Sequence, residues 1–328
     1  RDVLGSRGLG DVYKRQLMGF IMNKDRSLNE MMLSLFNKST IVDLSSETIS
    51  ESKSLSGRIY QDPEHNGEFE LDRVLTDIYA PQLIIFLPDK PNGTGILIIP
   101  GGGYQAVMLD KEGTALAPEF LSQGYTLFVL SYRLPSPVEG ENINKTFIDA
   151  ISAMLYIRKN ADKWHLQRHR IGVLGFSAGG HIASTFVNQI CDFKRSSDSK
   201  EQEIFAIPDF VGLIYPVISM KDDVTHPGSR KQLLGDNSTS ENIIQYSADL
   251  NVTSCFPPVF LLHCCDDDLV SIENSLLMYR GLIEKGVSAE MHLYEKGGHG
   301  FSIQWATDLS VGGWIKLFMD WMYSHGFK

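Results

Sequence analysis

Cysteine is scarce in this chain of 328 residues, which holds four cysteines and no C-x-x-C pair. So few cysteines argue against a dense disulfide framework and favour reduced thiols, which indicates a cytoplasmic protein. Adjacent Cys264 and Cys265 should point to opposite faces of a strand, as ordinary core thiols without a metal or redox role. The four positions are Cys191, Cys255, Cys264 and Cys265.

Long apolar runs and an excess of positive charge are also absent. The longest apolar runs, such as 95–100 and 127–130, fall far short of the roughly 18 residues of a membrane span and predict buried strands. The formal net charge of -10 repels polyanions, and no stripe of Lys and Arg interleaved with aromatic residues could neutralise phosphates. Neither a membrane nor nucleic acid is therefore expected as a partner.

The composition is that of an ordinary globular protein, with 43% hydrophobic and 21% charged residues. Residues 1–16 resemble translated adapter or vector sequence, so we expect the natural start at Met18 or Met22, or missing, which leaves a periplasmic or secreted protein open. We expect residues 17–70 to form a Ser-, Asn- and Glu-rich N-terminal extension with one short helix, Leu28–Phe36. Residues 71–328 should form the domain that carries the chemistry.

Within that domain, apolar runs alternate with helical patterns, which predicts an α/β fold with a mainly parallel sheet and helices on both faces. Expected helices include Ser271–Lys285 and one around 311–321, each with an apolar face. The polar stretch 218–258 is too long for a plain loop and predicts a cap insertion. The eight expected strands are Arg73–Tyr79, Gln82–Leu87, Gly95–Ile99, Thr126–Tyr132, Ile171–Gly175, Phe210–Tyr215, Val259–Cys264 and Glu290–Tyr294.

The motif with the most specific context is the G-x-S-x-G run Gly175–Gly179, which follows an expected strand and precedes the helix-like stretch His181–Gln189. A serine on such a tight strand-to-helix turn exposes its hydroxyl, and small flanking residues let the helix approach the strand. The pattern indicates Ser177 as a nucleophile. A glycine-rich turn without catalysis is the plain alternative.

A second glycine run, Pro100-Gly101-Gly102-Gly103-Tyr104, follows the expected strand Gly95–Ile99. Backbone N–H groups of such a loop can stabilise the oxyanion that develops in acyl transfer, by about 3 to 4 kcal/mol. We expect the N–H groups of Gly102, Gly103 and Ala178 to form this oxyanion hole. A dinucleotide-binding loop is the weaker alternative, because the G-x-G-x-x-G spacing and an acidic ribose partner are both missing.

An acid and a histidine follow the serine, in the chain order that an α/β-hydrolase requires. Three aspartates follow the strand ending at 264, and one of Asp266, Asp267 and Asp268 is the candidate acid. His299 lies in a glycine loop after the strand ending at 294. Both loops should meet at the carboxyl edge of the sheet. A histidine acts as general base only if its other nitrogen is held as a donor, which the acid achieves.

The other histidines have plainer interpretations. We expect His181 to pack or cap a helix and His263 to lie inside a strand, and no pair has metal-binding spacing such as H-E-x-x-H. His226 should lie at the surface, with a place in the pocket as the alternative. We therefore expect no metal and no cofactor. The remaining histidines are expected at the surface: His65, His165, His169, His292 and His325.

From residue 71 to the C-terminus the chain resembles bacterial esterase/lipase-type α/β-hydrolases that include acetylxylan esterases. The resemblance implies the α/β-hydrolase fold, its D-x-x-V pattern selects Asp267 as the acid because Val270 follows, and it implies acetyl esters of sugars as substrates. Tyr104 is then a candidate to close a shallow acyl site and stack on a sugar. The matching segments are P-G-G-G-Y at 100, S-Y-R-L-P at 131, G-F-S-A-G-G-H at 175, L-I-Y-P-V-I at 213, T-H-P-G-S-R at 225 and E-K-G-G-H-G-F at 295.

Two rival functions remain. A serine peptidase of the prolyl-oligopeptidase type shares the triad order, but such enzymes usually carry Tyr after the serine and a propeller domain, whereas Ala178 follows here. A catalytically inactive hydrolase fold used for binding is the other, since fold alone does not decide function. The partner that we expect is a small-molecule or oligosaccharide ester.

Overall fold

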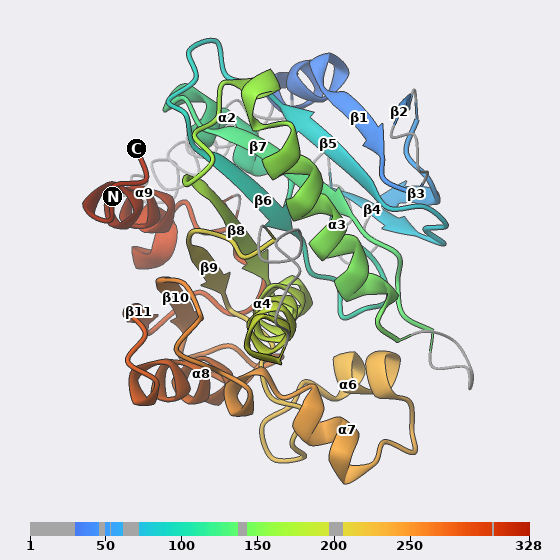
Figure 1. Ribbon diagram of the computed structural model, residues 1–328, viewed down its shortest axis with the longest axis vertical. Helices are drawn as coiled ribbons and strands as arrows, with labels where there is room; N and C mark the ends of the chain where they lie inside the picture. Colours follow the sequence, from blue (N-terminus) through green and yellow to red (C-terminus); the bar gives the residue numbers. More distant parts are fainter. Residues whose placement is uncertain are drawn as a thin grey trace, which may run out of the picture.

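A nine-stranded sheet forms the centre of the structure, a computed structural model that describes residues 30–45, 50–52, 54–61, 72–136, 143–196, 206–303 and 305–328 (Figure 1). The strand order is β11-β10-β9-β8-β6-β7-β5-β1-β2. The strands from β7 through β6, β8, β9 and β10 to β11 pair in parallel, and β5, β1 and β2 add antiparallel pairs at the other edge. Their bounds are β1 Thr40–Asp43, β2 Ser50–Ser52, β5 Gln82–Phe86, β6 Gly95–Ile99, β7 Thr126–Ser131, β8 Ile171–Phe176, β9 Val211–Ile214, β10 Val259–Cys264 and β11 Ala289–Tyr294.

The expected count of eight strands in one sheet is corrected in two places. Strand β4 (Arg73–Thr76) is not in the main sheet but pairs antiparallel with β3 (Arg58–Gln61). The N-terminal extension supplies β1 and β2, and β1 pairs with β5 and buries Val42. These strands have only three or four residues, too few for the alternation of apolar and polar residues to stand out in the sequence.

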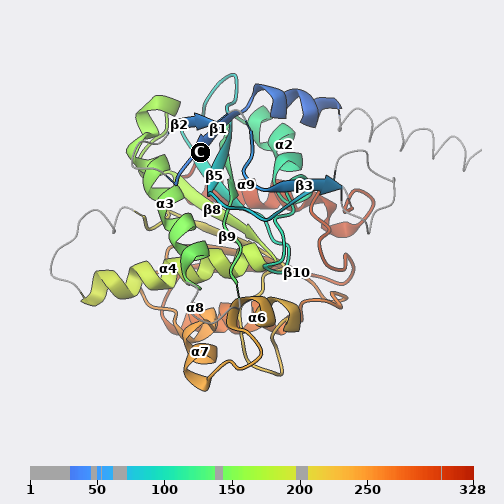
Figure 2. The ribbon, with the colours of Figure 1, turned by 90° about the vertical axis from the view of Figure 1, so that its right-hand side faces the viewer.

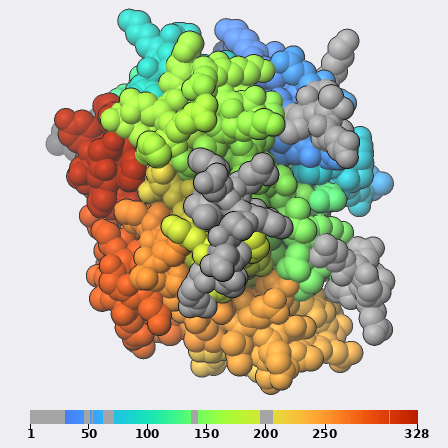
Figure 3. Space-filling model, viewed as in Figure 1, coloured from blue at the N-terminus to red at the C-terminus, as the bar shows by residue number. Residues whose placement is uncertain are grey.

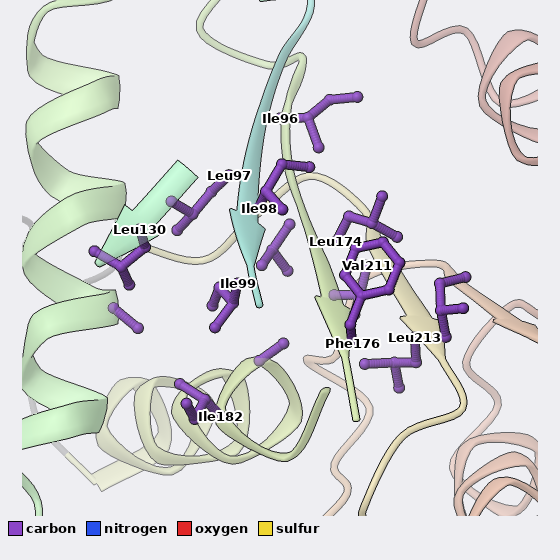
Figure 4. Close-up of a cluster of buried hydrophobic side chains, with 14 of the residues drawn as sticks. Ile96, Leu97, Ile98, Ile99, Leu130, Leu174, Phe176, Ile182, Val211 and Leu213 are labelled. Carbon is purple, nitrogen blue, oxygen red and sulfur yellow. The ribbon is translucent and has the colours of Figure 1, made fainter. Parts of the chain in front are cut away.

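The two central strands β6 and β8 contain only apolar residues and glycine, as expected where both faces of a sheet are covered. Every residue of β6 and β8 is buried. Figure 4 shows side chains of β6 such as Ile96 and Ile98 beside Leu174 and Phe176 of β8, with Ile182 of a helix below them. This packing fixes the carboxyl ends of the central strands, where the serine and glycine motifs lie.

Helices cover both faces, as the alternating pattern predicts. Figure 2, which views the sheet near its edge, shows α3 and α4 on one side and α2 and α9 on the other. The expected helix Ser271–Lys285 is α8, Glu273–Glu284, and the last expected helix is α9, which a short 3-10 turn precedes. The other bounds are α2 Ala117–Ser122, α3 Lys145–Lys159, α4 Ala178–Ser196 and α9 Trp314–Ser324.

The stretch 218–258 contains α6 (Pro227–Leu234), α7 (Ser240–Gln245) and a short 3-10 turn, Ala248–Leu250. In Figure 3 this orange segment forms the lower end of the molecule. Within the described ranges, no helix is long and apolar enough to cross a membrane. None of the four cysteines forms a disulfide, and Cys264 is buried while Cys265 is exposed, as the opposite faces of a strand require.

Three of the expectations fall outside the described residues. They are the adapter-like residues 1–16, the start of the expected helix Leu28–Phe36, and the surface position of His65. The described remainder of that helix spans 30–38 and leads into β1.

Candidate active site

Ser177 occupies a strained turn between β8 and α4. Its φ is 49°, a left-handed conformation that costs a non-glycine residue energy and persists only where the surroundings enforce it. Hydrogen bonds at both backbone groups of Ser177 hold this conformation. Its N–H donates to Ile214 O (3.1 Å), and its carbonyl accepts from Val217 N (3.0 Å) and Gly180 N (3.0 Å). The side chain is thereby held at the end of the sheet, as the G-x-S-x-G context predicts.

Close approach of α4 to the sheet explains one glycine of this motif. A Cβ at Gly179 would lie 2.0 Å from Ile99 O, so any larger residue would push the helix away from β6. The N-terminus of this 19-residue helix, with its partial positive charge, therefore stays beside Ser177.

His299 and Asp267 continue from Ser177 as one hydrogen-bonded chain. His299 Nε2 lies 2.8 Å from Ser177 Oγ, and His299 Nδ1 lies 2.7 Å from Asp267 Oδ2. The edge of Tyr215 packs against the imidazole, with ring centroids 4.9 Å apart. Since the carboxylate can only accept, Nδ1 carries the hydrogen and Nε2 is left to accept the serine proton.

The side chain of Asp267 is buried and accepts four hydrogen bonds. Its Oδ1 accepts from the N–H groups of Leu269 (3.0 Å) and Val270 (2.8 Å), and its Oδ2 accepts from His299 and, at 3.0 Å, from His263 Nε2. Burial alone would raise the pKa of Asp267, but the hydrogen bonds from the two histidines lower this pKa well below its usual range. Asp267 therefore stays ionised, and the structure places it, rather than its two neighbours, at His299.

His263 also contacts the carboxylate of Asp267. The expected position of His263 inside a strand did not predict this contact. Its Nε2 also lies 3.0 Å from Val270 O, so both acceptors require a hydrogen on Nε2, and Nδ1 is 2.8 Å from Ser275 Oγ, which can donate to it. A signal was present in the sequence: a buried His four residues before an Asp, at the end of a strand, can fold back onto it.

We expect His263→Leu to lower kcat by about 10- to 100-fold with little change in KM, because a hydrogen bond to a charged group contributes about 1.5 to 3 kcal/mol. Loss of this donor makes Asp267 a stronger acceptor, so the acid limb of the pH profile of kcat/KM should move to higher pH. His263→Gln keeps an amide donor in place and should recover most of both effects. An unshifted acid limb and full kcat in a folded His263→Leu would contradict this role.

Asp266 is exposed, as expected, but its carboxylate also has a structural role that the sequence did not indicate. Its Oδ1 accepts from the N–H groups of Gly297 (2.9 Å) and Gly298 (2.8 Å), and so it braces the loop that carries His299. Asp268 is exposed, as expected.

The loop that follows β6 brings the expected oxyanion residues to the serine. Gly102 and Gly103 have φ of 121° and 61°, and a Cβ at Gly102 would lie 2.3 Å from Ala106 O. Among the described residues, the N–H groups of Gly102, Gly103 and Ala178 have no backbone hydrogen-bond partner. Such unpaired donors, in a glycine loop and at the N-terminus of α4, can stabilise negative charge that develops on a substrate oxygen.

Buried polar groups fix this loop. Glu112 Oε2 accepts from Gly101 N (2.7 Å), and Tyr132 OH donates to Pro100 O (2.9 Å). An antiparallel bridge joins Val107 to Leu75 of β4, so the strand that is missing from the main sheet supports the oxyanion loop instead. Glu112 had no motif in the sequence that could single it out.

Tyr104 does not fit its expected role in sugar stacking. It is only 1% exposed, and its OH donates to His181 Nδ1 (2.5 Å), while His181 Nε2 donates to Tyr246 O (2.6 Å). Burial lowers the pKa of His181 to about 4, so the ring stays neutral and links the oxyanion loop, α4 and the end of α7. Tyr104 is part of the support of the site because the left-handed turn at Gly103 and Tyr104 directs it inward.

A cavity of about 440 Å³ opens over Ser177 and His299. Tyr60 of β3 lies in its wall, so the N-terminal extension contributes to the site. His226 was expected at the surface, but it lines the cavity, which was the alternative interpretation. In the ranges that the structure describes, no group of three or more His, Cys, Asp or Glu side chains could hold a metal ion. The other lining residues are Val74, Gly102, Gly103, Gln105, Ala106, Met108, Lys111, Glu112, Leu269, Val270 and Gly300.

Known proteins match a large part of this chain. The BD-FAE family model matches residues 77–282. The chain is 32% identical to endo-1,4-beta-xylanase B of Butyrivibrio fibrisolvens over 257 residues, 78% of this chain and 39% of that protein. It is 31% identical to an acetylxylan esterase of Xylanibacter ruminicola over 254 residues, 74% of this chain and 49% of that protein. The chain thus spans less than half the length of these two curated relatives.

Solved structures show the same architecture. An acetyl ester-xyloside bifunctional hydrolase from Caldicellulosiruptor lactoaceticus has a TM-score of 0.66 at 31% identity, covering 84% of this chain and 99% of that one. A sugar hydrolase from Lactococcus lactis has a TM-score of 0.62 at 27% identity, covering 79% and 100%. With the strand order above, these similarities confirm the expected α/β-hydrolase fold.

Proposed function

The chain belongs to the BD-FAE family of α/β-hydrolases, and we propose that it is a serine esterase that removes acetyl groups from plant polysaccharides or oligosaccharides such as acetylated xylan. The observation that carries the proposal is the hydrogen-bonded chain from Ser177 Oγ through His299 to Asp267. That chain can generate a nucleophile beside unpaired N–H groups, which is what acyl transfer needs.

The acylation step follows from this geometry. Ser177 Oγ attacks the ester carbonyl and its proton passes to His299 Nε2, while Asp267 stabilises the imidazolium. The oxyanion accepts hydrogen bonds from the N–H groups of Gly102 or Gly103 and of Ala178. The C–O bond to the alcohol then breaks, the alcohol leaves with the proton from His299, and an acyl-serine remains.

Deacylation uses the same groups. Water takes the place of the alcohol, gives a proton to His299 and bonds to the acyl carbon. The second tetrahedral intermediate collapses, the bond to Ser177 breaks, and His299 returns the proton to the serine. The products are a carboxylic acid and the free enzyme, with no cofactor required.

The cavity supports a small acyl group and a polar alcohol. Its wall mixes short apolar side chains such as Val74 and Ala106 with the polar groups of Tyr60, Gln105 and Lys111, which suit the hydroxyls of a sugar. The relatives whose names include acetylxylan esterase and acetyl ester-xyloside hydrolase favour the same substrate class.

We expect kcat/KM to fall as the acyl chain of an ester series lengthens from acetyl to octanoyl, by about tenfold or more, since a long apolar chain cannot satisfy the polar groups of the cavity wall, such as Gln105 and Lys111. Acetylated xylo-oligosaccharides should be cleaved, with acetate release as the measurement. Faster cleavage of octanoyl than of acetyl esters would count against the proposal, and so would cleavage of synthetic acetates with no acetylated saccharide turned over.

Two further assays separate the rival functions. A chromogenic proline peptide should not be cleaved, and its turnover without ester cleavage would favour the peptidase. A fluorophosphonate probe should label the protein, and a folded protein that takes no label would favour a binding role.

A further inference from the structure

We propose that His226 is a specificity residue whose Nε2–H donates a hydrogen bond to a sugar oxygen in the alcohol part of the substrate. This inference deepens the proposed function and rests on it. It assigns to the cap segment a substrate contact that the Ser177, His299 and Asp267 machinery does not supply.

His226 reaches the cavity from the start of α6. It is the N-cap residue of this helix, half-buried, and lines the same cavity as Ser177 and His299. A Cβ built on Gly103 would lie 3.8 Å from His226 Cε1, so the imidazole is next to the oxyanion loop. A substrate whose carbonyl oxygen is at that loop must therefore pass close to His226.

The helix cap fixes which nitrogen of His226 carries the hydrogen. Nδ1 accepts from the backbone N–H of Ser229 (3.2 Å) and lies 2.8 Å from Ser229 Oγ. A backbone N–H can only donate, so Nδ1 must be unprotonated. In the neutral ring the hydrogen is then on Nε2.

The cavity keeps this ring neutral. Burial lowers the pKa of His226, and the nearby charge of protonated His299 lowers it further, whereas Asp267 raises it. Neutral His226 does not add a second positive charge beside the imidazolium that forms during turnover. It offers the substrate a donor without competing for the serine proton.

A donor at this place discriminates between alcohols. Nε2 has no hydrogen-bond partner among the described residues, so a bound oxygen would satisfy it. A sugar presents hydroxyl and ring oxygens beside the ester. An alkyl acetate has no such oxygen, and para-nitrophenyl acetate carries its nitro oxygens on the far side of the ring from the ester. Sites built to hydrogen-bond a substrate oxygen reject analogues that lack it.

The test uses His226→Asn, which separates the helix cap from the donor. Asn is among the best N-cap residues, and its side-chain oxygen can accept from Ser229 N, but nothing remains at the position of Nε2. We expect kcat/KM on acetylated xylobiose to fall about tenfold or more, while kcat/KM on para-nitrophenyl acetate stays within about threefold of the native enzyme. Inhibition by free xylobiose should weaken in parallel.

Two other results for His226→Asn would contradict the assignment of His226 as a specificity residue. Equal losses on the two esters in a protein folded by circular dichroism would place His226 in the chemistry or the fold, and unchanged rates on both would remove it from recognition. His226→Gln, whose amide can take the place of Nε2–H, should retain the preference for the sugar ester even if the cap weakens. If the native enzyme itself cleaves para-nitrophenyl acetate but no acetylated saccharide, the proposed function fails, and the assignment of His226 with it.

Discussion

Ser177→Ala is expected to lower kcat by at least about 10⁴-fold, as loss of a triad member does in other serine hydrolases. The reason is that the turn holding Ser177 brings its Oγ within 2.8 Å of His299 Nε2, and no other hydroxyl has this contact among the described residues. Alanine removes the attacking atom and leaves the oxyanion donors in place, so a residual rate above that of water should persist. The measurement is steady-state turnover of para-nitrophenyl acetate and acetylated xylobiose.

Ser184→Ala is the matched control, on helix α4, which follows Ser177 directly. Ser184 is buried as well, but its Oγ donates only to the carbonyls of Gly180 and His181. This variant should keep turnover within about tenfold and still bind a fluorophosphonate probe, whereas Ser177→Ala should take up none. Near-full activity in Ser177→Ala would end the serine mechanism proposed here.

The sequence predicted the central strands and the chemistry at their ends because both rest on local patterns. Strands buried on both faces are continuous apolar runs, and residues that follow such strands must meet at one edge of the sheet. Ser177, His299 and Asp267 could therefore be proposed without coordinates. The structure joins them through two hydrogen bonds.

What could not be predicted depends on contacts between distant segments. Tyr104 looked available to a substrate, but its exposure depends on a positive φ at this residue and on His181, which lies 77 residues further along the chain. Strand β4 pairs with β3 and bridges to Val107, while β1 takes the place beside β5 in the main sheet, and no local period encodes these pairings. His226 lies in the cavity because α6 begins next to the oxyanion loop, and no local pattern predicts that contact.

Asp267→Asn is expected to keep the fold and lower kcat by about 10⁴-fold, for which serine proteases provide a precedent. In the native protein the carboxylate accepts from His299 Nδ1 (2.7 Å) and His263 Nε2 (3.0 Å), so two N–H groups converge on Oδ2. An amide can accept at only one of its two atoms. If its NH₂ faces the histidines, it clashes with both hydrogens or forces His299 into the tautomer whose Nε2–H cannot accept the serine proton.

Asp267→Asn should also shift the pH dependence of kcat/KM in a defined direction. Because the two histidines hold the pKa of Asp267 well below its usual range, the native carboxylate stays charged across the acid limb and stabilises the protonated form of His299. Without that charge His299 should bind its proton less tightly, so the acid limb of the remaining kcat/KM profile moves to lower pH. His263→Leu should move this limb to higher pH, since Asp267 stays charged but loses the hydrogen bond from His263.

Asp266→Asn and Asp268→Asn are the neighbouring controls, and each should stay within about tenfold of the native enzyme. Asp268 is exposed, and an asparagine at position 266 keeps an oxygen that can accept from Gly297 N and Gly298 N, so the loop of His299 remains braced. Asp266→Ala should cost more than Asp266→Asn because it removes that acceptor. If either outer asparagine variant were more damaging than Asp267→Asn while still folded by circular dichroism, the acid would be misassigned although the serine and histidine would stand.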